Sequence, residues 1–143
     1  MKVSVKRIYE LPAKSDGFRV LVDRLWPRGI SKSDAKLDSW LPDLGPSAAL
    51  RQWFNHDPAK WTEFCRRYQA ELKEKEDLLV LLVKEAQTKP ITLLYSAKDE
   101  RHNQAVALRS VLLKNLPFSQ SLVPPKTTAE IASGKKRRKS RSP

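Results

Sequence analysis

The stretch Ile91-Thr92-Leu93-Leu94-Tyr95 decides the fold, because this short run of β-branched and apolar residues follows a proline and precedes a polar segment. Such a run predicts a strand buried in a sheet that has helices packed against it. Upstream of it, the Asp57-Pro58 pair is a start signal for a helix, with a capping acceptor followed by proline. The predicted helix carries apolar residues at helical spacing on one face: Trp61, Phe64, Cys65, Tyr68 and Leu72.

Two further strands are predicted near the start of the chain. Residues 3–8 alternate apolar and polar side chains, and residues 18–22 are rich in β-branched and aromatic residues. Ser31 or Ser33 is suited to cap a short helix after them, and Ser47 is suited to cap a helix that runs to about Phe54.

The last two predicted helices flank the buried strand. Residues 77–87 form the first, with Leu78, Leu81, Leu82 and Glu85 in phase. Ser96 and Asp99 match a capping box that opens the second, which ends at Pro117. One side of that helix is predicted to be apolar: Ala105, Leu108, Val111, Leu112 and Leu116.

These elements predict an α/β protein with a small, at least partly parallel sheet and helices packed on it. We expect one domain over residues 1–123, followed by a disordered basic tail over residues 124–143, where apolar residues are too few to offset the entropy of ordering. The net charge of the chain is +12, and half of this excess lies in the last 18 residues. The predicted domain itself is therefore only moderately basic.

Several protein classes are excluded by composition. The single cysteine, Cys65, rules out an internal disulfide framework and a multi-cysteine zinc site. The longest apolar run, residues 78–83, is too short to cross a bilayer, and the first residues lack the apolar core of a signal peptide. We expect a cytoplasmic protein with no membrane partner. The chain has no P-loop or dinucleotide glycine fingerprint, so the sequence names no cofactor.

Four stretches together resemble one family. They are Val22-Asp-Arg-Leu-Trp-Pro-Arg-Gly29, Leu50-Arg-Gln-Trp-Phe-Asn-His-Asp-Pro58, Leu94-Tyr95 and Asp99-x-x-His-Asn-x-Ala105. Their order and spacing resemble the YeaO-like family, a group of small bacterial proteins classed as a domain of unknown function. The resemblance covers roughly residues 3–116 and implies an α/β fold. It implies no established activity, substrate or cofactor.

Charged and polar residues follow the predicted strands of residues 18–22 and 91–95, at the edge where open α/β sheets bind ligands. If these two strands are parallel neighbours, the side chains of the residues that follow them converge at that edge. Arg24 and Arg28 are suited to bind a phosphate or carboxylate, because guanidinium offers paired donors to such anions. Ion pairing of these arginines with Asp23, Asp57 or Asp99 is the alternative. The candidate ligand-binding residues are Arg24, Trp26, Arg28, His56, Tyr95, Ser96, Asp99 and Asn103.

Asp23 and His102 are the candidate catalytic residues, as an acid or base of a hydrolase or transferase that acts on a phosphorylated or carboxylated metabolite. A structural histidine hydrogen-bonded to a loop is the alternative. No local metal-binding spacing such as His-Glu-x-x-His is present, and the sequence predicts no metal site. Whether the protein is an enzyme, and in what oligomeric state it acts, stays open at this point.

The basic tail suggests a second class of function. A cluster of cationic side chains neutralises phosphates without reading base sequence, so the protein is alternatively a non-enzymatic module that associates with nucleic acid or with acidic partners. A solubilising extension is the other interpretation. The residues of this cluster are Lys135, Lys136, Arg137, Arg138, Lys139 and Arg141.

Overall fold

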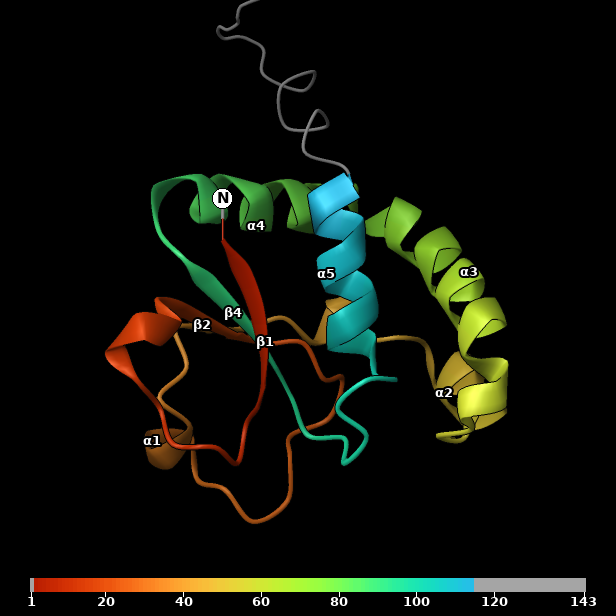
Figure 1. Ribbon diagram of the computed structural model, residues 1–143, viewed down its shortest axis with the longest axis horizontal. Coiled ribbons are helices and arrows are strands. Elements are labelled where there is room, and N and C mark those ends of the chain that lie inside the picture. Colours follow the sequence, from red (N-terminus) through yellow and green to blue (C-terminus); the bar gives the residue numbers. More distant parts are fainter. Residues whose placement is uncertain (1, 115–143) are drawn as a thin grey trace, which may run out of the picture. The chain divides into compact units, whose positions relative to one another are not determined.

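A four-stranded sheet forms the centre of the fold (Figure 1). In the computed structural model, which describes residues 2–114, the strand order is β1-β4-β2-β3 and every strand pair is parallel. The prediction of a partly parallel sheet with helices packed on it is therefore confirmed. The strands are β1 (Val3–Arg7), β2 (Phe18–Leu21), β3 (Ser39–Trp40) and β4 (Ile91–Tyr95).

The chain divides into a compact unit over residues 1–111 and a second unit over residues 112–143. The predicted domain boundary at residue 123 lies outside the described residues. So do the predicted disordered tail, its nucleic-acid-binding cluster, and the predicted helix end at Pro117.

Helices fill the long connection between β3 and β4 and follow β4. Ser47 caps α2 by accepting a hydrogen bond from the Leu50 N–H, as predicted, and Ser31 rather than Ser33 caps α1. Asp57 caps a single 3-10 turn at Pro58 that leads directly into α3. The helices are α1 (Lys32–Ala35), α2 (Ala48–Phe54), α3 (Trp61–Leu72), α4 (Glu76–Thr88) and α5 (Gln104–Lys114), and the 3-10 turns are η1 (Lys14–Asp16), η2 (Pro42–Leu44), η3 (Pro58–Lys60) and η4 (Lys73–Lys75).

The strands lie between α1 and the longer helices α4 and α5 (Figure 1). Because side chains alternate along a strand, Leu21 and Leu94 point to one face of the sheet, where they pack with Ile8 and Ala35. We call this the α1 face. Half-buried apolar residues of the chain around α1 pack against that cluster: Trp26, Ile30, Leu37 and Trp40. Among the described residues, no helix is long and apolar enough to span a membrane.

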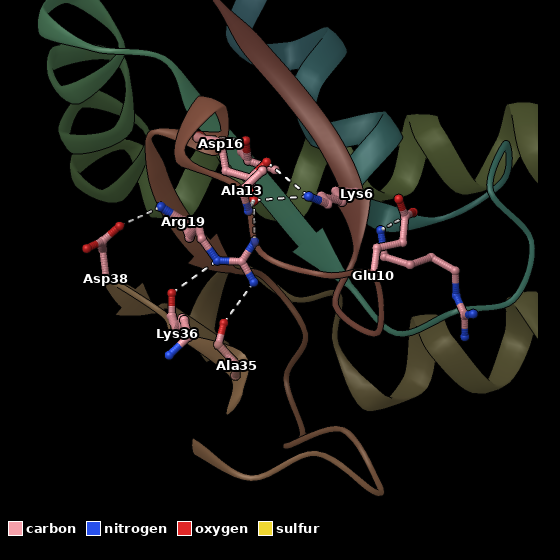
Figure 2. Close-up of polar contacts among 10 residues, drawn as sticks. Lys6, Glu10, Ala13, Asp16, Arg19, Ala35, Lys36 and Asp38 are labelled. Carbon is pink, nitrogen blue, oxygen red and sulfur yellow. Dashed lines mark hydrogen bonds and ion pairs between the residues drawn. The ribbon is translucent and has the colours of Figure 1, made fainter. Parts of the chain in front are cut away.

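A buried polar network also lies on the α1 face (Figure 2). Asp16 accepts hydrogen bonds from Lys6 Nζ at 3.1 Å and from Arg19 Nη1 at 2.6 Å. The remaining Arg19 donors bond the carbonyl oxygens of Ala35 and Lys36, which fixes the end of α1 to β2. The desolvation of Asp16 raises its pKa, but the hydrogen bonds from Ala13, Lys6 and Arg19 outweigh that effect and hold the pKa below its usual value.

Two local predictions were wrong, and one short strand was missed. In α4 the buried residues are Leu79, Leu82, Val83 and Ala86, whereas Leu81 is exposed, so the predicted phase is shifted. Strand β3 was not predicted. Its two residues pair only with Val20 and Leu21 of β2, and a two-residue strand has no periodicity of its own.

The predicted capping box at Ser96 was also wrong. The helix after β4 begins at Gln104, and Asn103 Oδ1 accepts the hydrogen bond from the Val106 N–H that a capping residue would accept. The Ser96 N–H instead donates to the carboxylate of Asp23. The loop between β4 and α5 is therefore longer than predicted, and no helix N-terminus lies at Ser96.

Candidate functional site

A cavity of about 540 Å³ opens at the carboxyl ends of β2 and β4. This volume lies within the ordinary range of small-molecule sites, and the edge is the one at which open α/β sheets bind ligands. Its wall comes from the loops after β1, β2 and β4, from α2 and the residues on either side of it, and from one residue each of α3 and α5. The lining residues are Tyr9, Asp23, Arg24, Leu25, Trp26, Pro27, Arg28, Pro46, Arg51, Gln52, Phe54, Asn55, His56, Phe64, Ser96, Ala97, His102, Asn103 and Gln104.

Most of the residues that the sequence singled out line this one cavity. They come from three separate segments, which meet because β2 and β4 are parallel neighbours. Tyr95 and Asp99 do not line it, although both contact residues that do. The predicted residues in the wall are Asp23, Arg24, Trp26, Arg28, His56, Ser96, His102 and Asn103.

Asp23 is the buried carboxylate of the cavity, with only 9% of its surface exposed. The Ser96 N–H donates to Oδ2 at 3.1 Å, and the Gln104 side-chain amide donates to Oδ1. Burial raises the pKa of Asp23, while these hydrogen bonds and the charge of Arg51 oppose the rise only in part. Asp23 makes no ion pair closer than 4 Å with any described residue. It is a carboxylate that folding leaves without a matched cation.

Asp99 orients His102 from behind the wall. Its Oδ1 accepts the backbone N–H groups of Arg101 and His102, and its Oδ2 lies 2.9 Å from His102 Nδ1. The hydrogen bond from the Arg101 N–H, followed by that from His102, holds the pKa of Asp99 below its usual value. Because an ionised carboxylate only accepts hydrogen bonds, His102 Nδ1 carries a proton and Nε2 is the ring nitrogen left for a ligand. The edge of the Trp61 ring packs against the imidazole.

Asn103 and Tyr95 serve the structure of the loop. The Asn103 amide donates to the Asp99 carbonyl at 2.9 Å, and its oxygen caps α5, so both ends of this side chain are used. Tyr95 is buried, and burial raises the pKa of its hydroxyl. We therefore assign these two residues to support of the wall rather than to ligand contact.

Arg24 is a clamp between two loops. Its guanidinium donates to the carbonyl oxygens of Gly45 at 2.8 Å and Pro46 at 3.1 Å. The loops approach so closely that a Cβ at position 45 would lie 2.8 Å from the Arg24 backbone nitrogen, which explains the glycine. The alternative structural role for this arginine was ion pairing with an aspartate, and its partners are carbonyl groups instead.

Arg28 and Arg51 differ from Arg24 in that their guanidinium groups are exposed and line the cavity. Neither side chain makes a hydrogen bond or a close ion pair within residues 2–114; Arg51 acts on Asp23 only through its charge. The loop that carries Arg28 is fixed by Tyr9, whose hydroxyl donates to the Arg28 carbonyl at 2.7 Å. Two cationic side chains are thus held at the cavity with their donors unused.

Aromatic rings complete the wall. Trp26 is half-buried, with its indole N–H on the Ile30 carbonyl and its ring edge-on to Trp40. Phe54 of α2 stacks on Phe64 of α3. His56 follows at the end of α2 in the left-handed backbone region, with φ of 54°. An ordinary side chain rarely adopts this region, and such strain often occurs in binding loops.

Five polar residues of the wall were not among the candidates from the sequence: Tyr9, Arg51, Gln52, Asn55 and Gln104. No local pattern marks them, but for all except Tyr9 the signal was present. Arg51, Gln52 and Asn55 lie in the stretch of residues 50–58 that carries the family resemblance, and Gln104 lies in the stretch of residues 99–105. Within the described part of the chain, no group of three or more His, Cys, Asp and Glu side chains is placed to hold a metal ion.

Comparisons with known proteins place this chain in a family. A family described as "Inactive DUF488-N3 subclade" matches residues 2–129. The uncharacterised protein YeaO of Escherichia coli K12 is 44% identical over 108 residues, which cover 76% of this chain and 94% of that protein. The uncharacterised protein Rv3073c of Mycobacterium tuberculosis H37Rv is 46% identical over 80 residues, 56% of this chain and 68% of that protein. No solved structure matches significantly. The chain therefore belongs to the inactive DUF488-N3 subclade, and the resemblance of its motifs to the YeaO-like family is confirmed.

Proposed function

We propose that the domain binds a small molecule in this cavity through an anionic group of that molecule, a phosphate or a carboxylate. The observation that carries the proposal is the pair of unused guanidinium groups, Arg28 and Arg51, in a cavity where three arginines face one aspartate. Guanidinium donates two parallel hydrogen bonds to such anions. An arginine with only a structural role would be expected to donate hydrogen bonds to other groups of the protein, as Arg24 does.

Binding without turnover is the form of this function that we favour. Asp23 and His102 both line the cavity, which is where the acid and base of a hydrolase or transferase would be needed. The description of the subclade as inactive argues against such a reaction. The proposal therefore makes Asp23 and His102 ligand-contacting groups.

Titration of the full chain with inorganic phosphate and with acetate, followed by amide NMR, tests the proposal. We expect shifts at Arg28, Arg51 and the loop of residues 96–103. Arg28→Ala and Arg51→Ala should each weaken binding by about tenfold or more, since a hydrogen bond to a charged group contributes about 1.5–3 kcal/mol. The matched control is Arg66→Ala, which removes an exposed arginine that pairs with Glu63 and does not line the cavity. Equal losses for all three variants would point to net charge alone, and the absence of shifts would refute the proposal.

The basic tail carries a separate proposal, which rests on the excess of cationic residues in the last 18 positions of the sequence. In that proposal the tail binds nucleic acid without sequence preference. Truncation after residue 123 should then abolish salt-dependent binding to a short duplex. Binding that is unchanged by truncation, or insensitive to salt, would remove the idea.

A further inference from the structure

We infer that the ligand of this cavity is a phosphorylated sugar, the chemistry that a sugar phosphate and a nucleotide share. The inference rests on the proposed function and adds a second recognition element to it. Arg28 and Arg51 account for the anion. The cavity also contains acceptors that an anion cannot satisfy, and these define the other end of the ligand.

The first acceptor is the carboxylate of Asp23. An ionised carboxylate has about four acceptor positions. The Ser96 N–H and the Gln104 amide take one position on each oxygen, and the Ser96 hydroxyl also acts on the carboxylate. These bonds fix the orientation of the carboxylate and leave at least one position to accept from a ligand. The oxygens of a fully ionised phosphate monoester such as methyl phosphate only accept, so this simple anion would be repelled by Asp23 rather than held by it.

The second ligand-facing group is His102 Nε2, a ring nitrogen that can bond a hydroxyl group, which both donates and accepts. Asp99 holds the other ring nitrogen at 2.9 Å, and Trp61 packs against the imidazole, so the ring is oriented from two sides. Nε2 makes no hydrogen bond within residues 2–114. The neighbouring Asn103 differs, because both of its polar side-chain atoms are already bonded.

The charge of the cavity selects among possible donors. An ammonium group would satisfy Asp23, but Arg24, Arg28 and Arg51 make the surroundings positive and disfavour a second cation. Hydroxyl groups donate hydrogen bonds without adding charge. Arg51 and Asp23 line the same cavity of about 540 Å³, so one small molecule can contact both. A sugar with several hydroxyl groups and one phosphate meets these requirements.

Four probes on the full chain separate the two recognition elements by calorimetric titration. Inorganic phosphate and methyl phosphate present the anion without a sugar, whereas ribose 5-phosphate and adenosine monophosphate present both. We expect the two sugar-containing probes to bind at least about tenfold more tightly than methyl phosphate. A further gain for adenosine monophosphate identifies a nucleotide, and equal affinities identify a sugar phosphate. If methyl phosphate binds as tightly as ribose 5-phosphate, the inference is wrong while the proposed function stands.

Asp23→Asn gives the sharper test, because its effects on the probes differ in sign. The variant should bind ribose 5-phosphate at least about tenfold more weakly, since the amide supplies one acceptor in place of two. It should bind methyl phosphate as well as the parent or better, because a repelling charge is removed. Arg28→Ala should weaken binding of every phosphate probe.

The matched control is Asp34→Asn, at an exposed carboxylate of α1 that does not line the cavity, and it should leave all affinities unchanged. A sugar preference that survives Asp23→Asn would overturn the inference. If no phosphate probe binds the parent protein, the inference fails. If acetate does not bind either, the proposed function fails as well.

Discussion

The same strand carries a buried aspartate at each end, and the two side chains have opposite surroundings. Asp16, before β2, is 8% exposed and faces Lys6 and Arg19 (Figure 2); Asp23, after β2, is 9% exposed and faces no paired cation among the described residues. The pKa of Asp16 lies below its usual value and that of Asp23 above it. Burial is therefore not what distinguishes them. The difference lies in whether the fold itself supplies the partners of the carboxylate.

The contrast between the two aspartates distinguishes a structural network from a candidate binding site by the hydrogen-bonding groups that each leaves unpaired. The network on the α1 face is closed: the carboxylate has its cations, and the donors of Arg19 end on carbonyl groups. The cavity is open: its carboxylate is held by neutral donors, and Arg28 and Arg51 keep theirs unused. A site that must receive a ligand has to leave such groups unmatched, at a cost in folding stability. Substitutions of the two aspartates and of Arg24 and Arg28 test this difference.

Asp16→Asn should have the largest effect on stability. The variant leaves Lys6 and Arg19 buried without their anion, and breaking a buried pair costs about 3 kcal/mol or more. For a domain of this size, that is a fall in the thermal midpoint of roughly 10 °C, measured by calorimetry. Asp34→Asn on exposed α1 is the matched control and should shift it by a degree or two at most. A small loss for Asp16→Asn would mean that the network contributes little.

The pH dependence of that effect has a definite sign. Because the native pKa of Asp16 is lowered, the native state releases the proton more readily than the unfolded state, whose pKa is near the usual value of 3.8. The stabilisation is therefore fully present above that value and is lost as the pH falls through the lower native pKa. Unfolding of parent and variant, compared from pH 7 down to pH 2, should show the two stabilities converge in acid.

Arg24→Ala should destabilise the fold by about 1–2 kcal/mol, because two hydrogen bonds to the carbonyl groups of Gly45 and Pro46 disappear. Urea unfolding measures this loss. The comparison is with Arg24→Lys, which keeps the charge but cannot reproduce the two-carbonyl contact and should recover little of the stability. Full recovery by lysine would show that charge, and not the clamp, is what the fold uses.

Asp23→Asn should stabilise the protein, by about 0.5–1 kcal/mol at neutral pH, in contrast to Asp16→Asn. The new amide oxygen can keep the hydrogen bond from the Ser96 N–H, and the Gln104 amide can turn its own oxygen toward the new NH2 group. Because the native pKa of Asp23 is raised, its burial in the charged form destabilises the native state as the pH rises through that value. The advantage of the variant should therefore vanish in acid, where Asp23 is protonated in both states, and develop as the pH rises. Thermal unfolding of parent and variant between pH 3 and pH 8 measures it. A destabilised variant at pH 7 would place Asp23 with Asp16 as a structural carboxylate.

The parts of this molecule that the sequence predicts are those with strong local chemistry. The apolar run of β4 and the caps Ser47 and Asp57 define their elements through nearest neighbours. The convergence of Asp23 with the loop of residues 96–103 also followed, because parallel neighbouring strands end at one edge. In these places local preference and the final fold agree.

The wrong or missing predictions occur where contacts with residues distant in the sequence determine the local structure. Ser96 and Asn103 are both suitable caps, and Asn103 caps α5 while Asp23, far away in sequence, takes the Ser96 N–H. In α4 six consecutive apolar residues, 78–83, leave the buried side undefined until the helix packs. Arg51 reaches the cavity only because α2 ends there. Local sequence patterns do not predict these tertiary contacts.

Arg28→Ala should have the smallest effect on stability, within about 0.5 kcal/mol, because its guanidinium makes no hydrogen bond or ion pair within the described residues. The Tyr9 hydroxyl bonds the carbonyl of residue 28, which the substitution retains, so the loop keeps its anchor. Urea unfolding of Arg28→Ala and Arg24→Ala compares the loss of stability at two arginines that lie in the same loop and line the same cavity. A loss at Arg28 equal to that at Arg24 would mean that the fold already uses both side chains, and the case for an anion site would rest on Arg51 alone. A negligible loss of stability for Arg28→Ala, together with weakened phosphate binding, would separate the roles of the two arginines. Arg24 would stabilise the wall of the cavity, and Arg28 would bind the ligand.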